Sequence, residues 1–129
     1  MAQSNVESIQ ALYRAFLKRE LMTILSLVDS GIEIRQTELL PWGGTYKGLG
    51  GLKDFFSKLM ENIDSKVDFT QWIEAGDSVA AIGHSRGKVN ATGNEFDIPI
   101  VHVWHLRDGK AVLFEPYVDV PAMLKALGK

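Results

Sequence analysis

The sequence has no cysteine, no long apolar run and no cluster of one charge. Without cysteine there can be no disulfide, no thiolate nucleophile and no cysteine-ligated metal. No apolar run approaches the roughly 18 residues of a membrane-spanning helix. The first residues, Met1–Asn5, lack the basic region and the apolar segment of a secretory signal peptide.

The charges are close to balanced, with a formal net charge of −2 and both signs scattered along the chain. There is no basic stripe to bind nucleic acid and no polybasic patch to bind a membrane surface. With 129 residues, 46% of them apolar, the chain is long enough to bury roughly two-thirds of its unfolded surface. These features predict one domain over residues 1–129, located in the cytoplasm, without nucleic-acid or membrane partners.

Helical patterns dominate the first half of the chain. Ser4 and Glu7 have the spacing of a capping box, and apolar residues then recur at helical intervals. We expect helices over residues 6–17, 22–28 and 49–63, the second closed by Asp29–Gly31. A strand over residues 32–36 and a short extended piece at Thr45–Lys47 separate the last two helices.

Strand patterns fill the second half of the chain. We expect strands over residues 67–74, 78–89, 95–106 and 111–118. Asp119 as an N-cap, followed by Pro121, predicts a short closing helix. Helices followed by an antiparallel meander define an α+β fold class.

The strand over residues 95–106 is apolar on both faces. Side chains alternate along a strand, so His102 and Trp104 share one face while Val101, Val103 and His105 share the other. Three short helices can cover only one of these faces. We therefore expect a second copy of the sheet to cover the face of Val101, giving a homodimer.

Several segments, in this order along the chain, carry a resemblance to one family: ALYRAFLKRE, GTYKGLGGLKDFF, AGDSVAAIGHSRGKVNATG and VHVWHLRDGKAVLFEPYVD. Together they resemble the SnoaL-like branch of the nuclear transport factor 2-like superfamily, which includes ketosteroid isomerases, epoxide hydrolases of the limonene type and polyketide cyclases. The resemblance implies a cone: a strongly bent antiparallel sheet wrapped around three helices, with a deep apolar pocket. It also implies dimers formed through the convex face of the sheet.

The resemblance places polar residues on opposite walls of this pocket. His102 matches the pocket-facing acid of relatives, and a neutral imidazole can both donate and accept a hydrogen bond. Gln36 matches the general-base Asp of the isomerases and cannot take a proton, which excludes their known mechanism. Tyr13, or its neighbour Leu12, lies nearest to their oxyanion Tyr. The epoxide hydrolases need an Asp–Arg–Asp set, whereas the matching positions here are Gly83, Ser85 and Pro116.

The expected site therefore has three polar candidates for catalysis, His102, Gln36 and Tyr13. The expected apolar ligand-binding wall consists of Ile34, Trp42, Phe55, Ile100, Trp104, Phe114 and Val118. His102 and His105 point to opposite faces and cannot share a metal, so we expect no metal and no organic cofactor.

Each candidate also has a structural interpretation. His102 can be a buried histidine bonded to a backbone carbonyl or to water, and Gln36 a polar group that orients ligand or water. Tyr13 can be a core residue of the first helix. Trp42 can be a pocket lid or pack on the surface, and Asp119 can lie at the pocket rim or cap the last helix.

Two functions remain open at this point. The first is an isomerase, cyclase or lyase without a cofactor, in which His102 is the acid/base or proton donor for a small apolar, cyclic ligand. The second is a non-catalytic ligand-binding or dimerisation module of the same fold, which the missing general base favours. The fold alone cannot choose between them.

Overall fold

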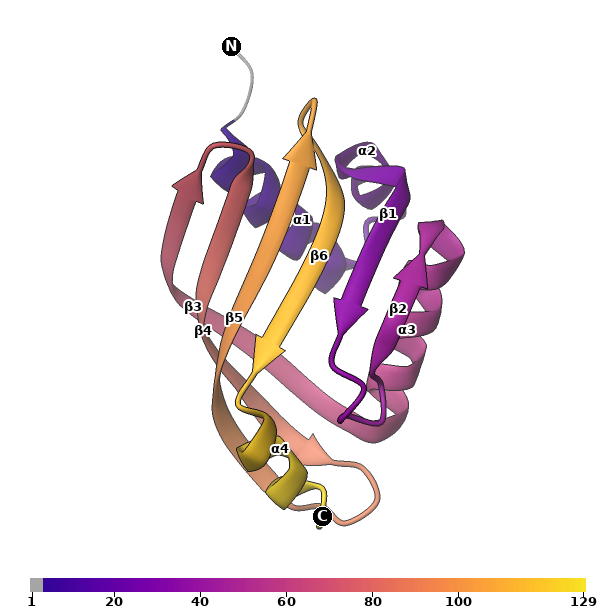
Figure 1. Cartoon of the computed structure of the whole chain (residues 1–129), viewed down its shortest axis with the longest axis vertical. Coiled ribbons are helices and arrows are strands. Elements are labelled where there is room, and N and C mark those ends of the chain that lie inside the picture. The colour runs from indigo at the N-terminus through magenta and orange to yellow at the C-terminus, as the bar shows by residue number, and fades with distance from the viewer. Residues whose placement is uncertain (1–3) are drawn as a thin grey trace.

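Four helices and six strands follow one another along residues 4–129, the part of the chain that the computed structural model describes (Figure 1). The helices are α1 (Asn5–Lys18), α2 (Leu21–Leu27), α3 (Gly48–Asn62) and α4 (Val120–Ala126). The strands are β1 (Val28–Gln36), β2 (Gly44–Lys47), β3 (Ile63–Ala75), β4 (Ser78–Val89), β5 (Glu95–Arg107) and β6 (Lys110–Val118). The predicted α+β class and order of elements are confirmed.

The two ends of α1 are formed in different ways. Ser4 Oγ accepts a hydrogen bond from Glu7 N and Glu7 Oε1 accepts one from Ser4 N, so the capping box is formed. The helix ends at Arg19, whose φ of 56° lies in the left-handed region.

The segment after α2 differs from the prediction. Val28 begins β1 instead of ending the helix, because it is buried and pairs with Ala111 of β6. Asp29 Oδ2 accepts a hydrogen bond from Gly31 N, and the register of β1 shifts between Val28 and Glu33. The polar triplet is therefore an irregular part of the strand and not a loop.

The six strands form one sheet in the order β2-β1-β6-β5-β4-β3. All neighbours are antiparallel except β1 and β6, which run parallel. In Figure 1 the sheet faces the viewer with α1 behind it and α4 at its lower end. The concave side holds an apolar core that includes Ile32, Ile34 and Trp104, each at most 1% exposed.

Two glycines of β4 let the neighbouring strand β3 come unusually close. A Cβ on Gly83 would lie 1.8 Å from the carbonyl oxygen of Asp68, and one on Gly87 would lie 2.1 Å from that of Asp64. No larger residue fits at either position without moving the backbone. The small residues of β4 thus permit the close approach of β3 in the bent sheet.

A bulge in β3 changes which residues face the concave side. The register shifts between Phe69 and Gln71, so that Phe69 lies opposite Gly83 and Trp72 lies opposite Ala81. Residues three apart on a regular strand point to opposite faces, but the extra residue brings both aromatic rings to the same face. The distance between the two ring centroids is 5.2 Å.

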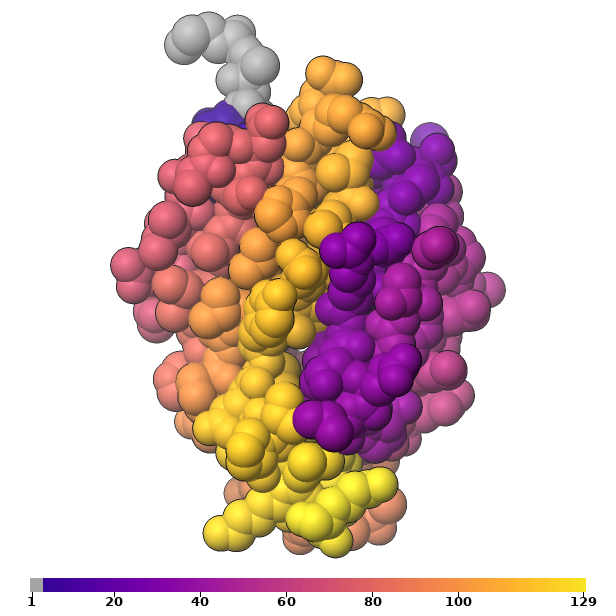
Figure 2. Space-filling view, in the orientation of Figure 1, coloured from indigo at the N-terminus to yellow at the C-terminus, as the bar shows by residue number. Residues whose placement is uncertain are grey.

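The two faces of β5 are as the alternation predicted. His102 and Trp104 point into the cone, where Tyr13 of α1 contacts both. Val101, Val103 and His105 lie on the convex face, which Figure 2 shows in space-filling form. Within residues 4–129, no helix is long and apolar enough to cross a membrane.

Candidate functional site

A chain of three side chains connects α1 to β5 inside the cone. The indole Nε1–H of Trp104 donates a hydrogen bond to Tyr13 Oη over 2.9 Å. Tyr13 Oη is also hydrogen-bonded to His102 Nδ1, at 2.6 Å. Trp104 and His102 lie two residues apart on the same face of β5, so one phenol reaches both.

Aromatic rings surround the imidazole of His102. The ring centroid of His102 lies 5.4 Å from that of Phe69 and 5.1 Å from that of Phe114, both in edge-on geometry. Tyr13 lies nearly parallel to the imidazole at 6.0 Å. Phe114 also stacks on Trp104 at 4.0 Å, which holds the rear wall of this group in place.

The second ring nitrogen of His102 is free. Nε2 has no hydrogen-bond partner among residues 4–129, yet that part of the chain contains no fully enclosed side-chain nitrogen or oxygen without a partner. His102 Nε2 must therefore reach accessible space. The residue is half-buried and keeps part of its surface accessible.

Burial determines the protonation of both polar groups. It lowers the pKa of His102 to about 3, and no charged neighbour contributes to this shift. Burial also raises the pKa of the Tyr13 hydroxyl well above its usual range, against a smaller opposite effect of the hydrogen bond from Trp104. At neutral pH the imidazole is uncharged and the phenol keeps its proton.

Gln36 provides another unused polar group on the concave face. Its residue is 6% exposed, and its side-chain amide has no hydrogen-bond partner in the described part of the chain. The register of β1 with β6 pairs Ile34 with Phe114. Gln36 lies two residues beyond this pair on the same face of β1, and His102 lies on β5, the strand on the other side of β6.

Most of the predicted apolar wall is packed core. Six of its members are at most 3% exposed: Ile34, Trp42, Phe55, Ile100, Trp104 and Phe114. Trp42 is therefore neither an exposed lid nor a surface residue, and its carbonyl oxygen accepts a hydrogen bond from Tyr46 Oη. These six side chains belong to the packed core. The accessible surface around His102 comes from half-buried residues such as Tyr13 and Phe69.

Two such residues on β3 were missed from the sequence. Phe69 and Trp72 are both half-buried and lie within 4.8 and 6.0 Å of the Tyr13 ring, measured between centroids. Regular alternation predicts that they face opposite sides. Only the bulge brings them together, and no residue type in Phe69–Trp72 marks a bulge.

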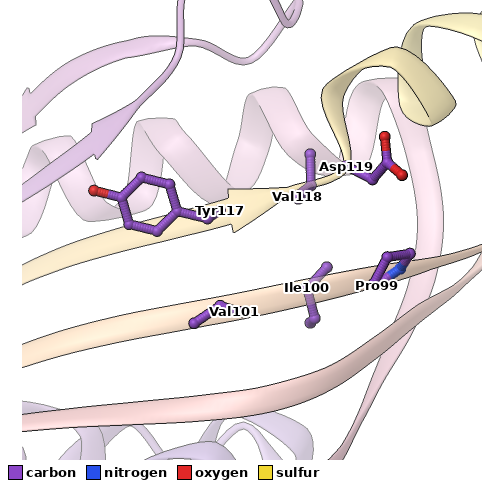
Figure 3. Close-up of a pocket in the computed structure, with 6 residues that line it drawn as sticks. All are labelled: Pro99, Ile100, Val101, Tyr117, Val118 and Asp119. Atoms are coloured by element: carbon purple, nitrogen blue, oxygen red, sulfur yellow. The ribbon is translucent and has the colours of Figure 1, made fainter.

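Val118 and Asp119 lie outside the group around His102. With Pro99, Ile100, Val101 and Tyr117 they line a hollow of about 200 Å³ between β5 and β6 (Figure 3). Asp119 Oδ1 also accepts a hydrogen bond from Ala122 N, so the carboxylate caps α4. Asp119 thus both caps the helix and lines a hollow, but this hollow does not touch His102.

Metal-binding side chains are not grouped in the described residues. Among residues 4–129, no three His, Asp or Glu side chains are close enough together to hold one ion. His105 lies on the convex face, where its Nδ1 is hydrogen-bonded to Ser78 Oγ at 2.8 Å and its Nε2 to Glu115 Oε1 at 3.2 Å.

A bent sheet around helices, with polar groups on its inner face, is the architecture of the nuclear transport factor 2-like proteins. The chain belongs to the SnoaL-like domain family, whose model matches residues 9–114. No curated protein matches the chain.

Solved structures share this fold over almost the whole chain. A nuclear transport factor 2-like protein of unknown function from Burkholderia pseudomallei is 23% identical, with a TM-score of 0.88 over 99% of this chain and 100% of its own. TerC, co-crystallised with polyporic acid, is 29% identical, with a TM-score of 0.85 over 97% of this chain and 98% of its own. A hypothetical protein with a ketosteroid isomerase-like fold from Catenulispora acidiphila, in complex with trimethylamine, is 17% identical, with a TM-score of 0.77 over 95% of this chain and 92% of its own.

Proposed function

We propose that this protein binds a small apolar, cyclic molecule inside the cone, with His102 as its polar anchor. The observation that carries the proposal is the free Nε2 of His102, which reaches accessible space among the rings of Tyr13, Phe69 and Phe114. Apolar walls with one or two converging polar groups are the usual composition of a small-molecule site. The co-crystal of TerC with polyporic acid supports an organic ligand in this fold.

Binding without catalysis is the version that the geometry supports best. The contacts of the imidazole within residues 4–129 are aromatic, and no carboxylate bonds to it. Gln36 stands where a general base is expected and has no proton-accepting group at neutral pH. The fold therefore offers a site that holds and polarises a ligand, without a base to remove a proton from it.

Isomerase or cyclase activity is the second candidate, and the position of His102 favours it. A neutral imidazole can polarise a carbonyl group and assist proton transfer to it. A substrate whose C–H bond next to the carbonyl group is already acidic needs less catalytic assistance from the protein. This activity predicts that the protein changes the absorbance of a conjugating ketone substrate over time. The change should be absent with the variant His102→Ala.

Ligand uptake can be tested on the 129-residue chain by amide NMR. With 1-tetralone as the probe, we expect shifts centred on Tyr13, Phe69 and His102. The variant His102→Ala should weaken binding, whereas His84→Ala, an exposed histidine paired with Asp97, should not. Shifts confined to the hollow at Tyr117, or no shifts at all, would contradict the proposal.

We further propose that the protein is a homodimer formed through the convex face. Ile73 and Tyr117 are 44 and 54% exposed on this face, and Val101, Val103 and Ile82 are only half-buried between them. An apolar patch of this kind on a sheet marks an interaction surface. The resemblance to a family that dimerises through this face supports the same arrangement.

The mass in solution tests the dimer directly. Light scattering on the eluting protein at micromolar concentration should give twice the chain mass. Val101→Lys, which places a charge opposite Ile82 and Tyr117, should give the single-chain mass with the same circular dichroism spectrum. A single-chain mass for the unchanged protein would contradict the dimer. The cytoplasmic location stays a prediction.

A further inference from the structure

The direction of each hydrogen bond in the Trp104–Tyr13–His102 chain follows from the donors available. An indole N–H can only donate, so Tyr13 Oη is the acceptor in the contact with Trp104. Tyr13 then has one proton to place. The only other hydrogen-bond partner of its oxygen within residues 4–129 is His102 Nδ1, at 2.6 Å.

The opposite arrangement leaves a proton unpaired. If His102 carried its proton on Nδ1, both that N–H and the Trp104 N–H would point at Tyr13 Oη. The phenol proton would then have no acceptor among residues 4–129, inside a site walled by Phe69 and Phe114. Buried donors without acceptors are rare because each loses its bond to water. Full pairing requires Tyr13 to donate to Nδ1.

A neutral imidazole that accepts at Nδ1 carries its proton on Nε2. Nε2 is the atom that lacks a partner and reaches accessible space. We propose that Trp104 and Tyr13 are positioning residues that hold His102 in the Nε2–H tautomer, so that the site selects ligands with a carbonyl-type oxygen. This inference rests on the proposed function, because it assigns the chemistry of the ligand atom that meets His102.

The arrangement also assigns what His102 does not do. A nitrogen that already carries a proton cannot accept one, so Nε2 is not a general base in this tautomer. Hydroxyl and amine hydrogens of a ligand find no acceptor there, whereas a ketone oxygen receives a hydrogen bond. Neutral imidazoles polarise carbonyl groups in this way in other enzymes.

The tautomer can be measured without any ligand. Long-range nitrogen–hydrogen correlation spectra of the ¹⁵N-labelled protein at pH 7 distinguish a protonated from an unprotonated ring nitrogen, and His102→Gln identifies the signals. We expect Nε2 protonated and Nδ1 unprotonated. In Tyr13→Phe, the ¹⁵N chemical shift of His102 Nδ1 should move to the value of an unprotonated nitrogen that receives no hydrogen bond. In Tyr46→Phe, which removes a hydroxyl bonded to the backbone carbonyls of Trp42 and Gly43, it should stay in place.

The selection of carbonyl-containing ligands can be tested with a matched pair of probes, 1-tetralone and its carbonyl-free counterpart tetralin. One hydrogen bond to a neutral donor should favour the ketone by about three- to tenfold in dissociation constant. This ratio should fall in Tyr13→Phe and stay unchanged in Tyr46→Phe. Equal affinity of the unchanged protein for both probes would overturn the proposed selection of carbonyl-containing ligands.

The two proposals fail in distinguishable ways. A protonated Nδ1 in the unchanged protein, or an Nδ1 signal that does not respond to Tyr13→Phe, overturns this inference even if the ketone binds. Absence of binding by both probes, with Nε2 protonated as expected, overturns the proposed function instead.

Discussion

Tyr13 and His102 are 89 positions apart in the sequence, and their hydroxyl oxygen and Nδ1 are 2.6 Å apart in the fold. This bond links α1 to β5, and the indole of Trp104 donates a hydrogen bond to the same hydroxyl. The polar contact of α1 with the concave face and the candidate ligand group are therefore one unit. We expect a substitution at any of the three residues to change the hydrogen bonding of the others.

Replacing His102 should separate its structural role from its binding role. His102→Ala leaves the Tyr13 hydroxyl without an acceptor, and we expect a loss of about 1–3 kcal/mol in the free energy of unfolding. His102→Gln keeps an acceptor oxygen and should lose less. Urea unfolding gives the values, with the exposed His84→Ala as a control within about 0.5 kcal/mol of the unchanged protein. A cost of His102→Ala no larger than the control would contradict the bond to Tyr13.

Acid should destabilise the protein through His102. Its pKa in the folded chain is lowered to about 3, so the unfolded chain binds a proton at higher pH than the folded one. Stability from this group is present above about pH 6.5 and declines as the pH falls, by at most about 1.4 kcal/mol per pH unit.

Comparing the unchanged protein with His102→Gln between pH 7 and pH 5 isolates this effect from the carboxylates. The stability difference between the two proteins should shrink or reverse as the pH falls. The ring signals of His102 should meanwhile show no titration in this range. A midpoint near pH 6.5 would show that the imidazole is not desolvated.

Glycine at position 83 should be essential for the bend of the sheet. Gly83→Ala places a Cβ within 1.8 Å of the Asp68 carbonyl oxygen, which β3 can relieve only by moving away. We expect a loss of at least about 3 kcal/mol in thermal or urea unfolding. Gly50→Ala is the matched control, because a Cβ there has no neighbour within 4 Å. In helix α3 that alanine should be neutral or stabilise by up to about 1 kcal/mol. Similar effects of the two variants would contradict the close approach of β3 and β4.

The cap of the last helix should be separable from the ligand site. Asp119→Ala removes the acceptor for Ala122 N and should cost about 1 kcal/mol, seen as faster amide hydrogen exchange in α4. Binding of 1-tetralone should not change, since the Asp119 hollow does not touch His102. Weaker binding in this variant would place the ligand near the end of β6 instead.

Local patterns were sufficient to predict the course of the chain. The capping box at Ser4, the alternation that points His102 and Trp104 to one side, and the N-cap at Asp119 each depend on neighbours within a few residues, and each is present. Two exceptions are Val28, which joins β1 because β6 lies beside it, and Ile63, which was expected in the third helix but begins β3 opposite Val89. The pairing of Val28 with Ala111 joins residues 83 positions apart, and no local pattern contains it.

The details of the site depend on contacts that the sequence does not show. The position of Tyr13 on a helical face predicts burial, but not that its hydroxyl meets both Trp104 and His102. The loop around Trp42 predicts an accessible ring, whereas the ring is 2% exposed because the core closes over it. Side-chain pairing across distant elements decides both cases.

The bulge between Phe69 and Gln71 has a consequence for comparing such chains. Because one additional residue in β3 determines that Phe69 and Trp72 face the same way, deleting Thr70 would turn one ring to solvent without altering either amino acid. A gap at this place in an alignment would then signal a different lining, even between chains that share both aromatics. In β3, the number of residues determines which side chains line the concave face as much as their identity does.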